Sequence, residues 1–266
     1  MNPETEIFLI VGTDTEVGKT VFSGLFTQYL IGCGVSARAL KPFCAGGKAD
    51  IEFLQAAHGG GIGQADLNFW YSDEPISPAA WELRYGQCVD FQGCVDWVKS
   101  RESSVSSGEG SLQSADGSGQ AGVLLVEGVG GLLAPLAKGK TVASLGKAIS
   151  AQLIVVAPNR VGVINQVLLT VEAATERGLE VACVVLMGQK EPDASSLDNA
   201  SLLRDFLPVL PDFKGVFEFP WLGLGADDPG QIGVNVKKAE KVLAKFLEAC
   251  KLRGPSGSGV SVQPSG

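Results

Sequence analysis

Histidine is almost missing from this sequence, and closely paired cysteines are missing altogether. His58 is the only histidine among 266 residues, and none of the six cysteines is followed by another three positions later. Structural zinc sites draw on such cysteine pairs and on histidine, so a zinc cluster is disfavoured. We interpret the six cysteines as buried, reduced thiols of a cytoplasmic protein.

Long apolar runs and an excess of basic residues are lacking too. No run approaches the ~20 apolar residues that a membrane-spanning helix requires, and the first residues lack the basic and apolar regions of a signal peptide. The net charge of −8 disfavours a nucleic-acid-binding surface. We therefore expect a cytoplasmic protein whose partners are neither nucleic acids nor membranes, and which holds an anionic substrate by local groups.

Apolar residues make up 45% of the sequence and charged residues 19%, which suits one large globular domain or two small ones with a sizeable core. Two segments, 102–119 and 254–266, are rich in serine and glycine instead. Because the α/β pattern continues unchanged after the first, we interpret 102–119 as a flexible insertion and 254–266 as a disordered tail. The predicted organisation is one domain over residues 1–253, followed by that tail.

A short apolar run near the N-terminus leads into a candidate phosphate-binding loop. Residues 7–11 are all apolar, as in a strand covered on both faces, and a helical pattern opens at Gly18, Lys19 and Thr20. Backbone N–H groups in such a turn face an anion, with the lysine at the outer phosphates and the threonine hydroxyl on Mg²⁺. The spacing is unusual, because Thr13 occupies the position of the first glycine. An ordinary strand–turn–helix with a surface lysine is the alternative.

Further apolar segments alternate with helical patterns along the rest of the chain. This alternation predicts an α/β fold, a single P-loop NTPase-like domain with a mostly parallel central sheet flanked by helices. Right-handed crossovers would bring the carboxyl ends of the strands to one edge of the sheet. The predicted strands are 7–11, 35–42, 123–126, 153–157, 181–187 and 216–222.

Three charged residues besides Lys19 are expected at that edge. Lys41 ends the second predicted strand, where open α/β sheets bind ligands, although a solvated strand-end lysine fits equally well. Asp50 opens a helical pattern and is either its N-cap or a carboxylate near the metal. Glu127 ends the strand at 123–126, and a buried carboxylate there needs a partner. We favour a metal-facing Glu127 over an exposed one.

These motifs together resemble those of the ATP-dependent dethiobiotin synthetases. The loop at 12–20, GTDTEVGKT, matches the variant phosphate loop of that family and accounts for the unusual spacing. The loop, the Lys-Pro strand end and the Glu-Gly-x-Gly-Gly turn in this order are highly specific, and the likeness covers nearly the whole chain. The other matching segments are Lys41-Pro42, Asp50, Ser77-Pro78, 126–131, 162–165 and 220–222.

The resemblance implies a homodimeric cyclo-ligase of biotin biosynthesis that uses ATP and Mg²⁺. Its substrates would be 7,8-diaminononanoate and CO₂, and its products dethiobiotin, ADP and phosphate. The diamine would capture CO₂ as a carbamate, ATP would phosphorylate the carbamate, and the second amine would close the ring and expel phosphate. Lys19 and Lys41 would be the catalytic residues, and Thr20, Asp50 and Glu127 would hold the metal.

The resemblance also implies which residues contact the two larger ligands. The nucleotide would be contacted by Thr15, Glu16, Val17, Gly18, Lys19, Thr20, Val21, Asp50, Glu127, Gly128, Val129, Gly130, Pro220, Trp221 and Leu222. The diamine would be contacted by Thr13, Lys41, Ala45, Gly162 and Asn165, with the last two binding its carboxylate across the dimer interface.

Two positions depart from the family pattern. Ala45 replaces a serine or threonine, so one hydroxyl contact of roughly 0.5–1.5 kcal/mol is missing unless another group supplies it. Met187 replaces an asparagine that reads adenine, and its thioether cannot make the paired hydrogen bonds of an amide. Gln189 could do so instead, which leaves the nucleotide preference open.

Three other functions share parts of this pattern. A partition or septum-site ATPase would carry an extra lysine within 13–17, which is absent, and a basic terminal helix like 236–253. We interpret that helix as docked, with a solvated basic face, rather than as membrane-binding. A cobyrinate amidotransferase would need a glutaminase domain, for which the chain has no room. A non-catalytic nucleotide-binding relative remains an alternative because of Ala45 and Met187.

Overall fold

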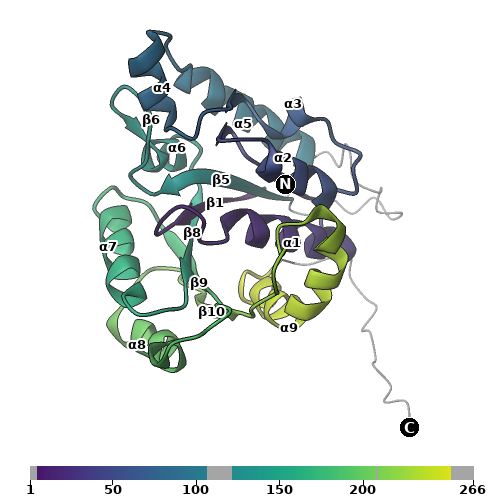
Figure 1. Ribbon diagram of the computed structural model, residues 1–266, viewed down its shortest axis with the longest axis vertical. Coiled ribbons are helices and arrows are strands. Elements are labelled where there is room, and N and C mark those ends of the chain that lie inside the picture. The colour runs from purple at the N-terminus through teal and green to yellow at the C-terminus, as the bar shows by residue number, and fades with distance from the viewer. Residues whose placement is uncertain (1–4, 107–121, 208, 253–266) are drawn as a thin grey trace.

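A six-stranded sheet with helices on both faces organises the molecule (Figure 1). The computed structural model describes residues 5–106, 122–207 and 209–252. The strand order is β10-β9-β8-β1-β5-β2 and all five pairings are parallel, which confirms the predicted α/β class. Its strands are β1 (Glu6–Gly12), β2 (Ala37–Leu40), β5 (Val123–Gly131), β8 (Gln152–Pro158), β9 (Val181–Met187) and β10 (Gly215–Phe219).

The described residues also form two small two-stranded sheets and a set of helices. The parallel pair is β3 (Phe43–Ala45) with β4 (Trp70–Ser72), and the antiparallel pair is β6 (Pro135–Ala137) with β7 (Lys140–Thr141). The helices are α1 (Lys19–Gly32), α2 (Ala49–Ala57), α3 (Gln64–Leu67), α4 (Pro78–Tyr85), α5 (Phe91–Ser106), α6 (Val142–Ala148), α7 (Val163–Thr175), α8 (Asn199–Phe206) and α9 (Ile232–Ala249), with 3₁₀ turns η1 (Ala194–Leu197) and η2 (Pro229–Gln231).

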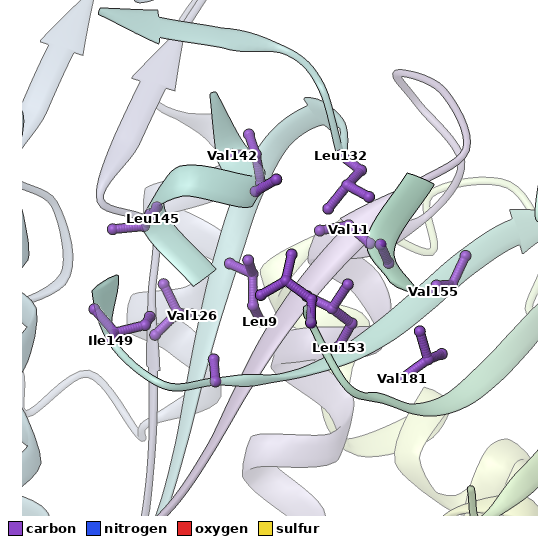
Figure 2. Packing of buried hydrophobic residues seen from close by; sticks show 14 of the residues in the cluster. Leu9, Val11, Val126, Leu132, Val142, Leu145, Ile149, Leu153, Val155 and Val181 are labelled. Carbon is purple, nitrogen blue, oxygen red and sulfur yellow. The ribbon is translucent and has the colours of Figure 1, made fainter. Parts of the chain in front are cut away.

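The apolar run of β1 is buried on both faces of the sheet. Leu9 and Val11 pack into the core shown in Figure 2, which also contains side chains of β5, α6, β8 and β9. Phe8 and Ile10 point to the opposite core, formed with α1 and α9. Successive side chains of a strand alternate between faces, so a strand covered on both sides must be apolar throughout.

Strand register brings the charged strand ends together. In the pairing of β1 with β5, Ile10 lies opposite Glu127, just before the loop that leads to α1. In the pairing of β2 with β5, Leu40 lies opposite Val126, so Lys41 follows beside Glu127. The order β1-β5-β2 therefore places the lysine and the carboxylate next to each other at the carboxyl edge of the sheet.

Several predicted boundaries were wrong. The last strand ends at Phe219 rather than at residue 222, because Pro220 has no N–H to continue the pairing. The segment at 102–119 does not begin as a flexible insertion, since α5 continues to Ser106. In that last turn Val105 is buried, and its carbonyl accepts a hydrogen bond from Ser36 Oγ at 2.9 Å. Residues 107–119 and the predicted tail at 254–266 lie outside the described residues.

The basic terminal helix is docked, as predicted. α9 buries Ala239, Leu243 and Phe246, and the Phe246 ring packs edge-on against Phe26 of α1 at 4.8 Å between centroids. Its lysines lie on the remaining face. Within residues 5–106, 122–207 and 209–252, no helix combines the length and hydropathy that crossing a membrane would demand.

All six cysteines are free thiols, but their predicted burial was only partly right. Cys44, Cys94, Cys183 and Cys250 are buried, whereas Cys33 and Cys88 are exposed. Cys33 follows the last residue of α1, where the helix leaves the core.

The single histidine links α2 to the outer edge of the sheet. His58 Nδ1 lies 2.7 Å from the carbonyl of Leu54, and Nε2 accepts a hydrogen bond from the Ala39 N–H of β2 at 3.1 Å. This pairing requires a neutral ring with its proton on Nδ1. Burial lowers the pKa of His58, and nearby Arg38 lowers it further, against the opposing hydrogen bond to Leu54.

We expect this histidine to make stability fall in mild acid. Its folded pKa lies below the unfolded value of about 6.5, so its contribution is complete above about pH 6.5 and is lost as the pH falls toward the folded pKa. Urea unfolding between about pH 5 and pH 8 should show a steeper loss for wild type than for His58→Gln. At about pH 8 the variant should be less stable by about 1 kcal/mol. Equal pH slopes would show that His58 is not the titrating group.

Candidate active site at the carboxyl edge of the sheet

The loop between β1 and α1 has the backbone of an anion-binding turn. Glu16 has φ 55° and Gly18 has φ 95°, the left-handed region that favours glycine. Gly18 is the N-cap of α1 and provides no side-chain cap. The first N–H groups of the helix are therefore left for a ligand, together with the positive end of the helix dipole.

Lys19 folds back over this loop. Its Nζ donates to the Asp14 carbonyl at 3.0 Å, and the side chain is 6% exposed. A Cβ at Gly12 would lie 2.9 Å from Lys19 Nζ and 2.4 Å from the Asp14 oxygen, so glycine is required there. Burial lowers the pKa of Lys19, opposed by the charge of Glu127 and reinforced by that of Lys41. An anion in the loop would offset that burial.

Four side chains form one connected polar cluster beside the loop, three of them from α1, α2 and β5 and the fourth from Lys41, directly after β2. Lys41 Nζ lies 2.7 Å from Asp50 Oδ2 and also contacts Glu127 Oε1. The same Glu127 oxygen accepts from Thr20 Oγ1 at 2.7 Å. Lys41 is 5% exposed and Glu127 1%, whereas Thr20 and Asp50 are half-buried. The structure thus brings together residues that lie up to 107 positions apart in the chain.

Lys41 and Asp50 are both charged at neutral pH. Burial alone would lower the pKa of Lys41, but the carboxylates of Glu127 and Asp50 outweigh it and raise that pKa. Burial would raise the pKa of Asp50, but the charge and hydrogen bond of Lys41 outweigh it and lower that pKa. Lys41 is therefore a permanent cation and Asp50 a permanent carboxylate at neutral pH. Asp50 is not the helix N-cap, because that position belongs to Lys48.

The oxygen atoms of this cluster fit a magnesium ion. Glu127 Oε2 is buried and has no hydrogen-bond partner among the described residues, an unstable situation for a carboxylate oxygen. Thr20 and Asp50 add a hydroxyl and a second carboxylate. No group of three His, Cys, Asp or Glu side chains that could hold a metal occurs in the described part of the chain. Mg²⁺ needs no such group, because it is commonly held by one or two carboxylates with phosphates and water.

The glycine turn after Glu127 packs against the phosphate loop. A Cβ at Gly128 would lie 3.2 Å from the Ile10 carbonyl and 2.8 Å from Val142. Gly130 has φ 62°, and a Cβ at Gly131 would lie 3.4 Å from the carbonyl of Gly12. Close packing of two backbones explains these glycines, and the predicted nucleotide contacts of 128–130 stay predictions.

The strand ends expected at the nucleotide base also lie near the loop. A Cβ at Gly18 would be 2.9 Å from Met187 Cε, so the methionine side chain lies on the phosphate loop. A Cβ at Gly188 would be 2.6 Å from the Trp221 nitrogen, which brings the segment 220–222 against the end of β9. Gln189 donates its side-chain amide to the Met187 carbonyl at 2.8 Å. That amide is therefore engaged with its own strand end.

The residues expected to contact the diamine fall into two groups. Ala45 ends β3, which begins two residues after Lys41, whereas Thr13 follows β1 and donates its N–H to the Val156 carbonyl of β8 at 3.0 Å. Thr13 Oγ1 is buried without a partner among the described residues. Gly162 and Asn165 lie at the exposed start of α7, which follows β8. β8 flanks β1 on the side away from β5 and β2, so this second group is not part of the cluster.

Sequence reasoning missed some neighbours of the site. The buried Cys44 thiol donates to the Gly47 carbonyl at 3.2 Å. Burial raises the pKa of this thiol to about 11, although the nearby positive charge of Lys41 acts to lower that pKa. Its position between Lys41 and Asp50 was the available signal. The hydrogen-bonded loop at 193–199 was also missed, although its Asp-Ala-Ser sequence favours a local side-chain turn.

Comparison with known proteins identifies the family. Residues 6–213 match the family model described as "AAA domain". The ATP-dependent dethiobiotin synthetase BioD of Ralstonia nicotianae is 34% identical over 206 residues, 74% of this chain and 83% of that protein. The chain belongs to the ATP-dependent dethiobiotin synthetase family. The corresponding protein of Akkermansia muciniphila is 30% identical over 206 residues, 76% of this chain and 89% of that protein.

Membership in the dethiobiotin synthetase family confirms the resemblance predicted from the motifs and makes the chain an ATP-dependent ligase. Among solved structures, an ATP complex of McdA from Cyanothece matches with a TM-score of 0.51 at 13% identity, over 96% of this chain and 100% of that one. Apo McdA matches with a TM-score of 0.52, also at 13% identity. Likeness at this level shows a shared fold only.

Proposed function

We propose that this chain carboxylates 7,8-diaminononanoate with CO₂ and closes the ring to dethiobiotin, converting ATP to ADP and phosphate with Mg²⁺, in the cytoplasm. The single observation that carries the proposal is the buried cluster in which Lys41 joins Asp50 and Glu127 beside the phosphate loop. Family membership supports the choice of reaction. The alternative of a non-catalytic relative has no comparable support, since each charged residue of the cluster is present.

The proposed chemistry joins two anions. One amine adds to CO₂ and loses a proton, forming a carbamate. A carbamate oxygen attacks the γ-phosphorus of ATP, and ADP leaves. The second amine then attacks the carbamoyl carbon, loses its proton and expels phosphate. Because carbamate and γ-phosphate repel each other, the protein must neutralise and position them rather than supply a nucleophile.

The cluster has the charges that this task requires. Lys19 would bind the outer phosphates, and Lys41 would lie between carbamate and γ-phosphate. Thr20, Asp50 and Glu127 would hold Mg²⁺, which supplies charge neutralisation at the phosphates. Because the four residues of the cluster are already held to one another by a hydrogen bond and ion pairs, little reorganisation would accompany the reaction.

The remaining contacts are proposed on the predicted residues. Residues 15–21, 128–130 and 220–222 would surround the nucleotide, and Thr13 and Ala45 would face the diamine. The start of α7, with Gly162 and Asn165, would bind the substrate carboxylate of a second subunit in a homodimer. Exposed apolar side chains before and within α7, Val161 at 73% and Leu169 at 56%, support burial of this region against another copy. Sedimentation equilibrium would measure that state.

Turnover measured with ATP, CTP and GTP in parallel tests the function. We expect purified protein to make dethiobiotin from the diamine, bicarbonate and Mg²⁺. Because neither Met187 nor the engaged Gln189 amide is arranged to read adenine, the three nucleotides should differ in kcat/KM by less than about tenfold. Met187→Asn should shift the preference toward ATP. No product with any nucleotide would contradict the proposed function.

A further inference from the structure

A buried polar network surrounds the turn between β8 and α7. Asn159 and Asn199 are 8% and 2% exposed, and Asn199 Nδ2 donates to Asn159 Oδ1 at 2.9 Å. Asn159 Nδ2 donates to the Ser196 carbonyl at 3.1 Å, and the Asn159 N–H donates to the Met187 carbonyl at 2.8 Å. The turn is therefore held by β9 on one side and by η1 on the other.

Asp193 closes this network with both of its carboxylate oxygens. Oδ2 accepts a hydrogen bond from the Val161 N–H at 2.8 Å. Oδ1 accepts from the N–H and the hydroxyl of Ser195, at 2.9 and 2.5 Å. Hydrogen bonds from the Ser195 hydroxyl and from Val161 lower the pKa of Asp193, so it is a carboxylate at neutral pH. Charged acceptors make stronger hydrogen bonds than neutral ones.

The peptide that Asp193 holds comes directly before the start of α7. Gly162 is the N-cap of this helix, with φ 88°, and the Val163 N–H donates back to the Arg160 carbonyl at 3.1 Å. Among the described residues, the N–H groups of Gly162, Ile164 and Asn165 have no backbone acceptor. Their placement depends on the turn at 159–162, and hence on the bond from Val161 to Asp193.

We infer that Asp193 is a positioning residue that holds the start of α7 in the geometry needed to bind the diamine's carboxylate. The inference rests on the proposed function, because it takes the helix start as the carboxylate subsite. Asp193 itself would not touch the substrate. Its carboxylate oxygens already accept hydrogen bonds from Val161 and Ser195. Asp193 therefore does not compete with the substrate carboxylate for the free N–H groups at the start of α7.

Steady-state kinetics of three variants test the inference. Asp193→Ala should raise KM for the diamine about tenfold, while kcat and KM for ATP stay within about twofold of wild type. Asp193→Asn keeps an acceptor for Val161 and should stay within about threefold in every parameter. Asp198→Ala is the matched control, because Asp198 is an exposed acid on the same loop whose side chain does not cap α8. It should behave as wild type.

Amide hydrogen exchange at Val161 gives a second readout, faster in Asp193→Ala than in wild type or Asp193→Asn. If Asp193→Ala fails to fold, Ser195→Ala, which removes one bond to Asp193, should raise KM for the diamine two- to threefold. An unchanged diamine KM in an active Asp193→Ala, or equal rises in both KM values, would overturn the inference. A wild-type protein that makes no dethiobiotin would instead contradict the proposed function.

Discussion

Lys41→Ala should lower the turnover number by roughly 10³-fold while changing nucleotide affinity less than about threefold. Removing a preorganised charge from a buried site of this kind costs about 3–4 kcal/mol of transition-state stabilisation. Lys41 is the cation placed to reduce repulsion between carbamate and γ-phosphate, whereas the nucleotide keeps Lys19 and the backbone of the loop. Single-turnover rates with saturating ATP and a fluorescent-nucleotide titration would measure the two quantities.

A matched control separates this effect from loss of any lysine near the site. Lys48 is exposed, seven positions further on, and lies over the Tyr71 ring at 5.1 Å. Lys48→Ala should leave turnover within about twofold of wild type. Turnover in Lys41→Ala equal to that of Lys48→Ala would remove Lys41 from the mechanism.

The same substitution also tests folding, because it leaves a buried carboxylate without its cation. Glu127 is 1% exposed, and breaking a buried ion pair by removing one partner typically costs roughly 3–5 kcal/mol. The double variant Lys41→Met with Glu127→Gln is neutral at both positions and should recover most of that stability without recovering turnover. This separation shows whether lost activity reflects lost charge or lost structure.

The sheet and the gathering of charged residues were predictable because both depend on local patterns. An unbroken apolar run such as 7–11 is compatible with a strand buried on both faces and little else, and parallel strands bring their carboxyl ends to one edge. Which of those residues touch was not predictable. The contact of Lys41 with Glu127 depends on β5 lying between β1 and β2, and strand order is not written in any local segment.

Features that depend on distant packing were missed or left open. Asp50 could be a helix cap or a site residue until the structure placed Lys48 at the cap and Asp50 on Lys41. Strands β3 and β4 have three residues each, which is too short for a periodic signal, and a helix-rich stretch separates them in the chain. Helix α5 continues beyond the expected boundary because Val105 is buried against the rest of the protein. Composition alone does not reveal that burial.

Glu127→Gln should raise the Mg²⁺ concentration for half-maximal turnover on the order of 10²-fold and lower maximal turnover by a similar factor. The amide keeps the shape of the carboxylate but loses its charge, and the buried Oε2 position no longer offers a strong metal ligand. Asp50→Asn should have a smaller effect, because the Asp50 side chain is 43% exposed and water can replace it at the metal. Turnover measured over a Mg²⁺ titration would rank the two carboxylates.

An exposed acid on the same helix supplies the control for this ranking. Glu52 lies two positions after Asp50 in α2 and faces solvent, so Glu52→Gln should leave the Mg²⁺ dependence unchanged. Lys41 retains Asp50 as a partner in Glu127→Gln, so the variant should fold and its kinetics should report the metal site rather than unfolding. A wild-type Mg²⁺ dependence in Glu127→Gln would mean that the unpartnered oxygen serves another ligand.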